Sequence, residues 1–182
     1  MKSTYVALLR GINVGGHHKV PMAELSKQMA LLGFSNVRTL LNSGNVLFDV
    51  PNTSSEALEQ QLGESLRTQF GFPIPVLVRT SEEFLDLLQL KPFEHIEMHK
   101  NLRLYVSFLK QQPVSKPVLP LSSADSSYTI LAVEQKAVFS VLDLTASKTV
   151  TAMADLEHKF GKEITTRNWN TVLRICSLLQ PK

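Results

Sequence analysis

The chain has 182 residues, of which 43% are hydrophobic and 19% charged, a composition typical of folded globular proteins rather than disordered ones. The net charge of +3 permits an anionic partner without requiring one, and no run of lysine and arginine indicates a nucleic-acid patch. The single cysteine, Cys176, excludes an intramolecular disulfide and a cysteine-rich zinc site. With no apolar run near the ~18 residues of a membrane span and no signal-peptide pattern, we expect a cytoplasmic protein without membrane contact.

The first half of the sequence predicts the element order βαββαβ. Strands are expected at residues 4–10, 37–41, 46–50 and 74–79. The helices between them carry apolar stripes at helical spacing, namely Met22, Leu25, Met29 and Leu32, and then Leu58, Leu62, Leu66 and Phe70. Capping boxes are expected at Thr53 with Glu56 and at Thr80 with Glu83, where a third helix begins. Lys91-Pro92 ends that helix.

The second half repeats this order less regularly, after a connection at 92–101. Strands are expected at 102–109, 128–133, 137–144 and 163–167, and helices around Met153 to Phe160 and Val172 to Leu179. Residues 110–127 carry three prolines and predict either a loop or a broken, weak helix. The fold class is therefore α+β, with two ferredoxin-like (βαββαβ) units in residues 1–91 and 102–182, each an antiparallel sheet covered by helices.

Three polar segments lie outside the apolar stripes. The first, residues 10–21, connects a strand to a helix and contains Arg10, Asn13, Gly15 and Gly16 without any acid. Glycines at such a junction free backbone N–H groups to face a ligand, and helix N-termini favour anions. Its glycine spacing matches no named nucleotide motif, and tight packing of the helix on the strand is the alternative interpretation.

The other two segments are a turn and a strand-to-helix junction. Asn42-Ser43-Gly44-Asn45 joins two strands, and good turn residues alone explain it. Thr165 to Thr171 places Arg167, Asn168 and Asn170 around Trp169, the only tryptophan. Asn168 or Asn170 can simply cap the last helix. Alternatively, arginine and asparagine side chains recognise phosphates, carboxylates or base edges, and tryptophan offers a stacking face.

Evidence for catalysis or metal binding is weak in this sequence. His95 and His99 have a metal-chelating spacing but no evident third ligand, so we predict no metal site. Ser43 has no base placed to activate it, and no catalytic residue or cofactor can be assigned. Cys176 lies on the inner stripe of the last helix and is expected to be a buried, inert thiol.

The three segments also carry a resemblance. Tyr-Val-Ala-Leu-Leu-Arg-Gly-Ile-Asn-Val-Gly-Gly, Ser-Gly-Asn-Val and Thr-Thr-Arg-Asn-Trp-Asn-Thr resemble a bacterial family catalogued as domain of unknown function 1697. The resemblance implies a fold and a set of characteristic positions, but no activity. Those positions are Arg10, Asn13, Gly15, Gly16, Ser43, Gly44, Asn45, Arg167, Asn168, Trp169 and Asn170. His17-His18 departs from the lysine or asparagine expected in relatives.

We therefore expect a phosphate- or carboxylate-bearing small molecule to bind between the two units, where the three segments converge. Its expected contacts are Arg10, Asn13, Gly15, Gly16, Ser43, Asn45, Arg167, Asn168, Trp169 and Asn170. One alternative is binding of single-stranded nucleic acid, which is less favoured because the strands lack the paired aromatics of an RNA-recognition signature. The other is a structural or partner-binding protein without a ligand, and the sequence assigns no oligomeric state.

Overall fold

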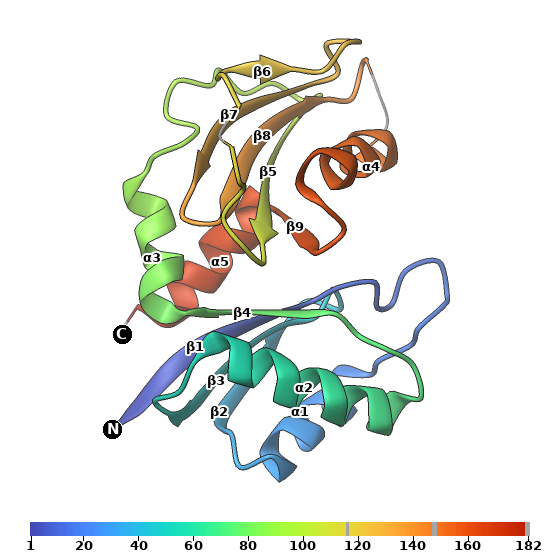
Figure 1. Ribbon diagram of the computed structural model, residues 1–182, viewed down its shortest axis with the longest axis vertical. Coiled ribbons are helices and arrows are strands. Elements are labelled where there is room, and N and C mark those ends of the chain that lie inside the picture. The colour runs from blue at the N-terminus through green and yellow to red at the C-terminus, as the bar shows by residue number, and fades with distance from the viewer. Residues whose placement is uncertain (116, 147–148, 181–182) are drawn as a thin grey trace. The chain divides into compact units, whose positions relative to one another are not determined.

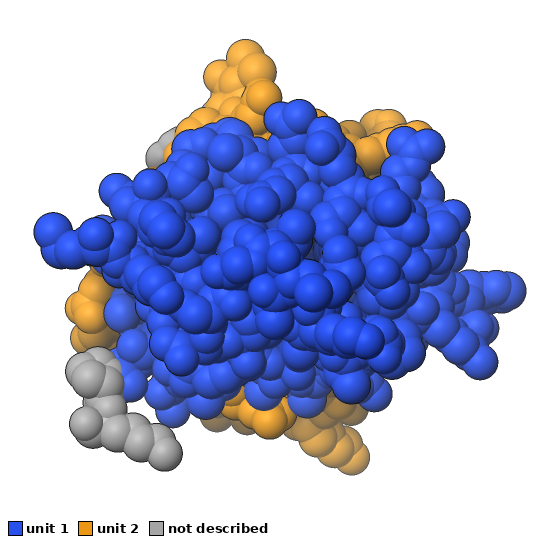
Figure 2. Space-filling view, turned by 90° about the horizontal axis from the view of Figure 1, so that it is seen from below, with its two compact units in different colours: residues 1–85, 175–182 blue, residues 86–174 orange. Residues whose placement is uncertain are grey.

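The computed structural model describes residues 1–115, 117–146 and 149–180, which form an α+β fold with two antiparallel sheets and five helices (Figure 1). The predicted fold class is therefore confirmed. The chain divides into two compact units, coloured separately in Figure 2. Unit 1 comprises residues 1–85 and 175–182, and unit 2 comprises residues 86–174. The divisions fall inside α3 (Ser81–Gln89) and α5 (Trp169–Leu179).

Unit 1 has the predicted βαββαβ order. Its elements are β1 (Lys2–Leu9), α1 (Met22–Leu31), β2 (Ser35–Leu40), β3 (Asn45–Pro51), α2 (Ser55–Phe70) and β4 (Val76–Thr80). The strand order is β2-β3-β1-β4, and every pair of neighbours is antiparallel. Because β1 lies inside the sheet, its last five residues are all buried, as its continuous apolar run predicts.

The core of unit 1 lies between its sheet and the two helices α1 and α2, which cover one face of that sheet (Figure 1). Leu25 and Met29 of α1 and Leu58, Leu62 and Leu66 of α2 are fully buried there. These residues belong to the two predicted apolar stripes. The helical spacing of leucine and methionine therefore determined correctly which face of each helix packs inward.

Helix starts follow local side-chain chemistry. Ser54, not the predicted Thr53, is the N-cap of α2, and its hydroxyl accepts a hydrogen bond from Ala57 N at 3.1 Å. Either neighbouring hydroxyl residue could cap this helix, which explains the error of one position. At α3 the predicted capping box is confirmed. Thr80 Oγ1 accepts from Glu83 N at 3.1 Å, and Glu83 Oε2 accepts from Thr80 N at 2.8 Å.

Unit 2 has a five-stranded sheet in the order β6-β7-β8-β5-β9, again antiparallel throughout. Its elements are β5 (Leu102–Leu109), β6 (Leu121–Ser122), β7 (Tyr128–Glu134), β8 (Ala137–Asp143), α4 (Thr149–Phe160), β9 (Ile164–Asn168) and the first part of α5. Its core is formed by the sheet with Ala152 and Leu156 of α4. Tyr128 also donates a short hydrogen bond from its hydroxyl to the Asp155 carboxylate.

Between β5 and β7, unit 2 differs from unit 1. The described residues of 110–127 form a loop and the two-residue strand β6, and none of them is helical. The loop, one of the two alternatives left open by the sequence, is therefore observed. Pro113, Pro117 and Pro120 lack backbone N–H donors, so a helix equivalent to α1 would lose hydrogen bonds at three positions.

The last turn of α5 packs within unit 1, although the sequence placed residues 102–182 together. Cys176 is buried and its thiol donates to Phe84 O at 3.5 Å, and Arg38 Nη1 donates to Leu178 O at 3.0 Å. Burial raises the pKa of Cys176 to about 11, which suits the predicted inert thiol. The division into domains 1–91 and 102–182 stays a prediction.

Candidate functional site

The glycine segment forms a small hairpin that precedes α1. Asn13 N donates to His18 O and His17 N donates to Val14 O, both at 3.1 Å. Gly15 and Gly16 occupy the tip with φ angles of 58° and 81°, a region that other residues rarely adopt. Both glycines are exposed. They therefore form the turn of a hairpin several residues before the first turn of α1, rather than a cradle at the helix N-terminus.

Asn13 holds this hairpin to the rest of unit 1. Its amide nitrogen donates to Val20 O at 3.0 Å and to Asn42 O at 2.8 Å, and its amide oxygen accepts from Val20 N at 2.9 Å. A primary amide has two N–H donors, so both are used. The Asn13 side chain therefore links the hairpin to the 42–45 turn, two segments that the sequence placed in one site.

The 42–45 turn is likewise fixed by its own residues. Asn45 is fully buried, and its amide nitrogen donates to Leu40 O at 2.8 Å and to Ser43 Oγ at 3.1 Å. Gly44 O accepts a hydrogen bond from Leu9 N at 2.8 Å. A Cβ atom at Gly44 would lie 2.7 Å from Leu9 Cβ, too close for any larger residue. This geometry supports the alternative interpretation of the turn as a structural feature.

Arg10 and His18 complete the polar surroundings of the hairpin. Arg10 is half-buried directly after β1, and its backbone N donates to Pro75 O at 2.9 Å. The ring of His18 stacks on Phe72 with centroids 4.5 Å apart, and its Nδ1 lies 3.2 Å from Gly11 O. Ligand binding by the unit 1 residues stays a prediction, as does their convergence with Arg167. These residues are Arg10, Asn13, Gly15, Gly16, Ser43 and Asn45.

In unit 2, Arg167 is buried in β9, with 8% of its surface exposed. Its Nη1 donates to Thr166 O at 3.0 Å and to Thr165 Oγ1 at 3.3 Å. Burial lowers the pKa of Arg167 to about 10, because removal from water disfavours the charged guanidinium. The next residue, Asn168, accepts a hydrogen bond from Asn170 N through its Oδ1 at 2.9 Å and caps α5, as one sequence interpretation predicted.

Trp169 is the first residue of α5 and is half-buried. Phe93 packs edge-on against its indole with centroids 5.3 Å apart, and Phe139 packs similarly at 6.5 Å. The aromatic contacts fix the position of the ring in unit 2 and leave part of its surface open to solvent. The indole therefore keeps a partly exposed face, as the ligand-binding interpretation of this segment requires.

A cleft of about 240 Å³ lies beside Trp169 within unit 2. It is lined by Met98, His99, Lys100, Leu102, Arg103, Leu104, Asn168, Trp169 and Asn170. Three of the predicted site residues therefore meet here, together with two cationic side chains and no carboxylate among the described lining residues. We refer to this pocket as the Trp169 cleft.

The cations of the Trp169 cleft lie at and just before the start of β5. Arg103 Nη1 donates to Lys100 O and Leu102 O, both at 2.8 Å, which holds the guanidinium against the backbone. Lys100 is exposed. The Asp143 carboxyl, on the strand next to β5, has a lowered pKa, mainly because Thr145 donates hydrogen bonds to it, with His99 contributing. A cleft lined by cationic side chains favours anions.

Sequence reasoning missed His99, Lys100 and Arg103 as members of this site. They lie in the predicted connection and in the first residues of the following strand, where isolated basic residues carry no motif. A usable signal was pairing geometry: Tyr105 of β5 lies opposite Asn168 of β9, so the start of β5 must lie near Trp169. The closeness of these residues to Trp169 becomes clear only once the antiparallel pairing of β5 with β9 is known, and the sequence does not state that pairing.

The fold and the cleft define an α+β protein with two antiparallel sheets and, in its second unit, a cleft lined by basic and apolar side chains. The chain belongs to the family described as Protein of unknown function (DUF1697), whose profile matches residues 1–139. The predicted family is therefore confirmed. The matched range contains the first two motifs and ends before Arg167 to Asn170, so the family match does not include the motif in the Trp169 cleft.

A solved structure shares the fold over nearly the whole chain. It is described as conserved bacterial protein SP0830 from Streptococcus pneumoniae, with a TM-score of 0.71, 23% sequence identity, and coverage of 99% of this chain and 100% of that one. Among curated proteins, none matches this chain. Within the described part of the chain, no helix has both the length and the apolar character needed to cross a membrane.

Proposed function

We propose that this protein binds a small anionic molecule, bearing a phosphate or carboxylate, in the Trp169 cleft of unit 2. The observation that carries the proposal is that Asn168, Trp169 and Asn170 line one cleft with Lys100 and Arg103. Cationic side chains attract the acid group, and the amide of Asn170 can donate to or accept from a polar group next to it. The indole supplies a flat apolar surface for the rest of the ligand.

The size and chemistry of the cleft limit what it can hold. At about 240 Å³ it is slightly smaller than typical ligand pockets of roughly 300–1,000 Å³, so it suits a small metabolite rather than a large cofactor. Its described lining residues provide hydrogen-bond donors and a stacking surface rather than a paired acid and base. The cleft therefore supports binding, and the proposal includes no reaction.

A thermal-shift screen of mononucleotides, sugar phosphates and small carboxylates at low salt tests this function. A ligand at about 100 times its dissociation constant should stabilise the protein by about 2.7 kcal/mol. Lys100→Ala should remove most of the shift, whereas Lys27→Ala, which removes the same charge from an exposed position of α1 in unit 1, should not. Salt should weaken binding, because exposed charges are screened beyond about 10 Å at about 0.1 M ionic strength.

Two outcomes would reject the proposal. One is a screen without any stabilising anion. The other is an equal loss of the shift in Lys100→Ala and Lys27→Ala, which would mean that only net charge matters. Short single-stranded oligonucleotides should be included as a separate arm. Stabilisation by oligonucleotides but not by mononucleotides would favour the nucleic-acid alternative instead.

A further inference from the structure

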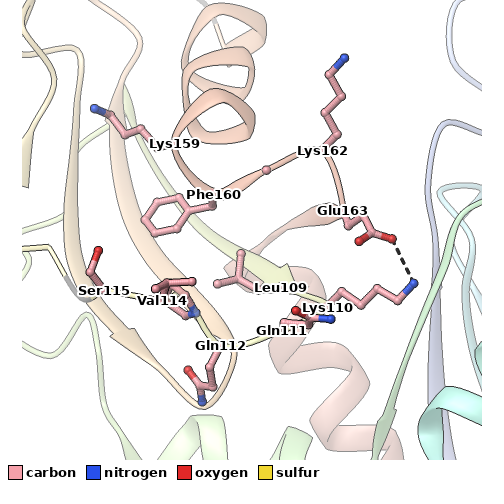
Figure 3. Close-up of a pocket in the computed structure, with 12 residues that line it drawn as sticks. Leu109, Lys110, Gln111, Gln112, Val114, Ser115, Lys159, Phe160, Lys162 and Glu163 are labelled. Carbon is pink, nitrogen blue, oxygen red and sulfur yellow. Dashed lines mark hydrogen bonds and ion pairs between the residues drawn. The ribbon is translucent and has the colours of Figure 1, made fainter.

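A second pocket of unit 2, with a volume of about 400 Å³, lies where β5 ends, between the loop that follows it and the turn between α4 and β9 (Figure 3). Its lining residues are Leu109 to Ser115 on one side and Lys159 to Glu163 on the other. None of them lines the Trp169 cleft. We refer to it as the Lys159 pocket.

The backbone fixes both sides of the Lys159 pocket. Leu109 N donates to Lys136 O at 2.8 Å, and Lys110 N donates to Glu163 O at 3.3 Å. Leu109 is also paired with Ile164 across the β5–β9 ladder. The pocket therefore begins at two anchored strand ends, which gives it a defined position in unit 2.

Part of the inner surface of the pocket is apolar, beside the polar side chains of Gln111, Gln112 and Ser115. Leu109 is almost fully buried beneath it, and Phe160 at the end of α4 is half-buried with its ring among the lining residues (Figure 3). Val114, on the opposite loop, is fully exposed. Apolar side chains left in water at the edge of a pocket favour a ligand with an apolar portion, which would cover them.

The rim of the pocket is basic. Among the described lining residues it carries Lys110, Lys159 and Lys162 against a single acid, Glu163. Lys110 Nζ lies 3.0 Å from the Glu163 carboxylate, an ion pair drawn as a dashed line in Figure 3. The two side chains are 43% and 70% exposed, so the pair is weak and a ligand carboxylate can compete with Glu163 for the lysine.

We propose that the Lys159 pocket binds a small amphipathic anion, a molecule with one acid group and an apolar chain. The lysines at the rim take the acid group, and Phe160, Leu109 and Val114 contact the chain. This inference is independent of the proposed function, because it concerns other residues and requires an apolar tail. Charge complementarity and the apolar part of the inner surface together favour this ligand class.

The test is a heteronuclear NMR titration of the full chain with octanoate, compared with octanol and with inorganic phosphate. Octanoate should shift the amide signals of residues 109–112, 114–115 and 159–163, while those of Asn168 to Asn170 stay in place. Octanol lacks the charge and inorganic phosphate lacks the tail, so both should bind much more weakly. Binding of octanol as tight as that of octanoate would overturn the proposal, and so would the absence of octanoate binding.

Glu163→Gln and Lys159→Ala give opposite expectations. Removing the Glu163 carboxylate removes one competitor of the ligand acid group for Lys110 and should tighten octanoate binding about two- to fivefold, the range given by one exposed charge interaction. Lys159→Ala should weaken binding by a similar factor. Lys91 and Glu94 form a matched exposed ion pair at 3.3 Å elsewhere in unit 2, so Lys91→Ala and Glu94→Gln are the controls. Equal effects at both pairs would show that no local site exists.

Discussion

The two units are built on one plan, which their hydrogen bonds and strand pairing show position by position. Val6 of β1 pairs with Arg79 of β4, and Val106 of β5 pairs with Arg167 of β9. Both arginines are buried, and each donates from Nη1 to the carbonyl of the residue before it, at 2.8 Å and 3.0 Å. Burial lowers the pKa of both guanidinium groups.

The units differ in the segment that follows the first strand. In unit 1 this segment is the glycine hairpin and α1, and the Asn13 amide is used in hydrogen bonds that hold the hairpin in place. In unit 2 it is a proline-rich loop that lines the Lys159 pocket. The segment with the stronger motif thus stabilises its own fold, while a pocket forms where no motif is evident.

The largest expected effect concerns Gly44 of unit 1. Its φ is 78°, and an added Cβ atom would lie 2.7 Å from Leu9 Cβ, so alanine is both strained and overpacked there. Gly44→Ala should lower the free energy of unfolding by about 2–5 kcal/mol. Denaturant unfolding measures it. At the equivalent place in unit 2, the carbonyl that accepts from Leu109 N belongs to Lys136. This lysine adopts a φ of 57°, so the position tolerates a residue other than glycine.

Gly63→Ala is the control for this prediction. Gly63 lies within α2, and a Cβ atom there would meet nothing within 4 Å. Alanine should therefore stabilise the protein by roughly 0.5–1 kcal/mol through its better helix propensity. If Gly44→Ala changed stability by no more than this control, the structural interpretation of the 42–45 turn would be wrong.

A smaller effect is expected at the asparagines of the two units. Asn13→Ala removes three hydrogen bonds and leaves Val20 N and two carbonyls to find new partners, so it should cost about 1–3 kcal/mol. Asn170 is exposed at the start of α5, so Asn170→Ala should change stability by less than about 0.5 kcal/mol. A larger loss of stability in Asn170→Ala than in Asn13→Ala would contradict this account, in which Asn13 stabilises the loop of unit 1 and Asn170 faces a ligand in the cleft of unit 2.

Much of the fold could be predicted from the sequence, because apolar periodicity and caps are local signals. The stripes of α1 and α2, the Thr80–Glu83 capping box and the loop alternative for 110–127 all follow from residues close in the chain. The assignment of Cys176 to unit 1 could not be predicted, since its contact with Phe84 joins residues 92 positions apart.

The candidate site was predictable only in part. The Arg167 to Asn170 motif identified Trp169 and its neighbours, because a polar cluster around the only tryptophan is unusual. Its cationic partners Lys100 and Arg103 are brought to the cleft by the pairing of β5 with β9, a long-range relation. Asn13 and Asn45 were predicted as ligand contacts because asparagine is common in binding sites. In the structure their side-chain amides donate to backbone carbonyls of unit 1 instead.

The most direct measurement is a fluorescence titration of Trp169, the only tryptophan, with the strongest stabilising anion from the screen. A saturable change in its emission is expected for the native chain, lost in Lys100→Ala and kept in Lys19→Ala, which removes an exposed charge from beside the glycine hairpin. Loss of the signal in Lys19→Ala with retention in Lys100→Ala would contradict the proposed site, because it would place the ligand at the unit 1 loop.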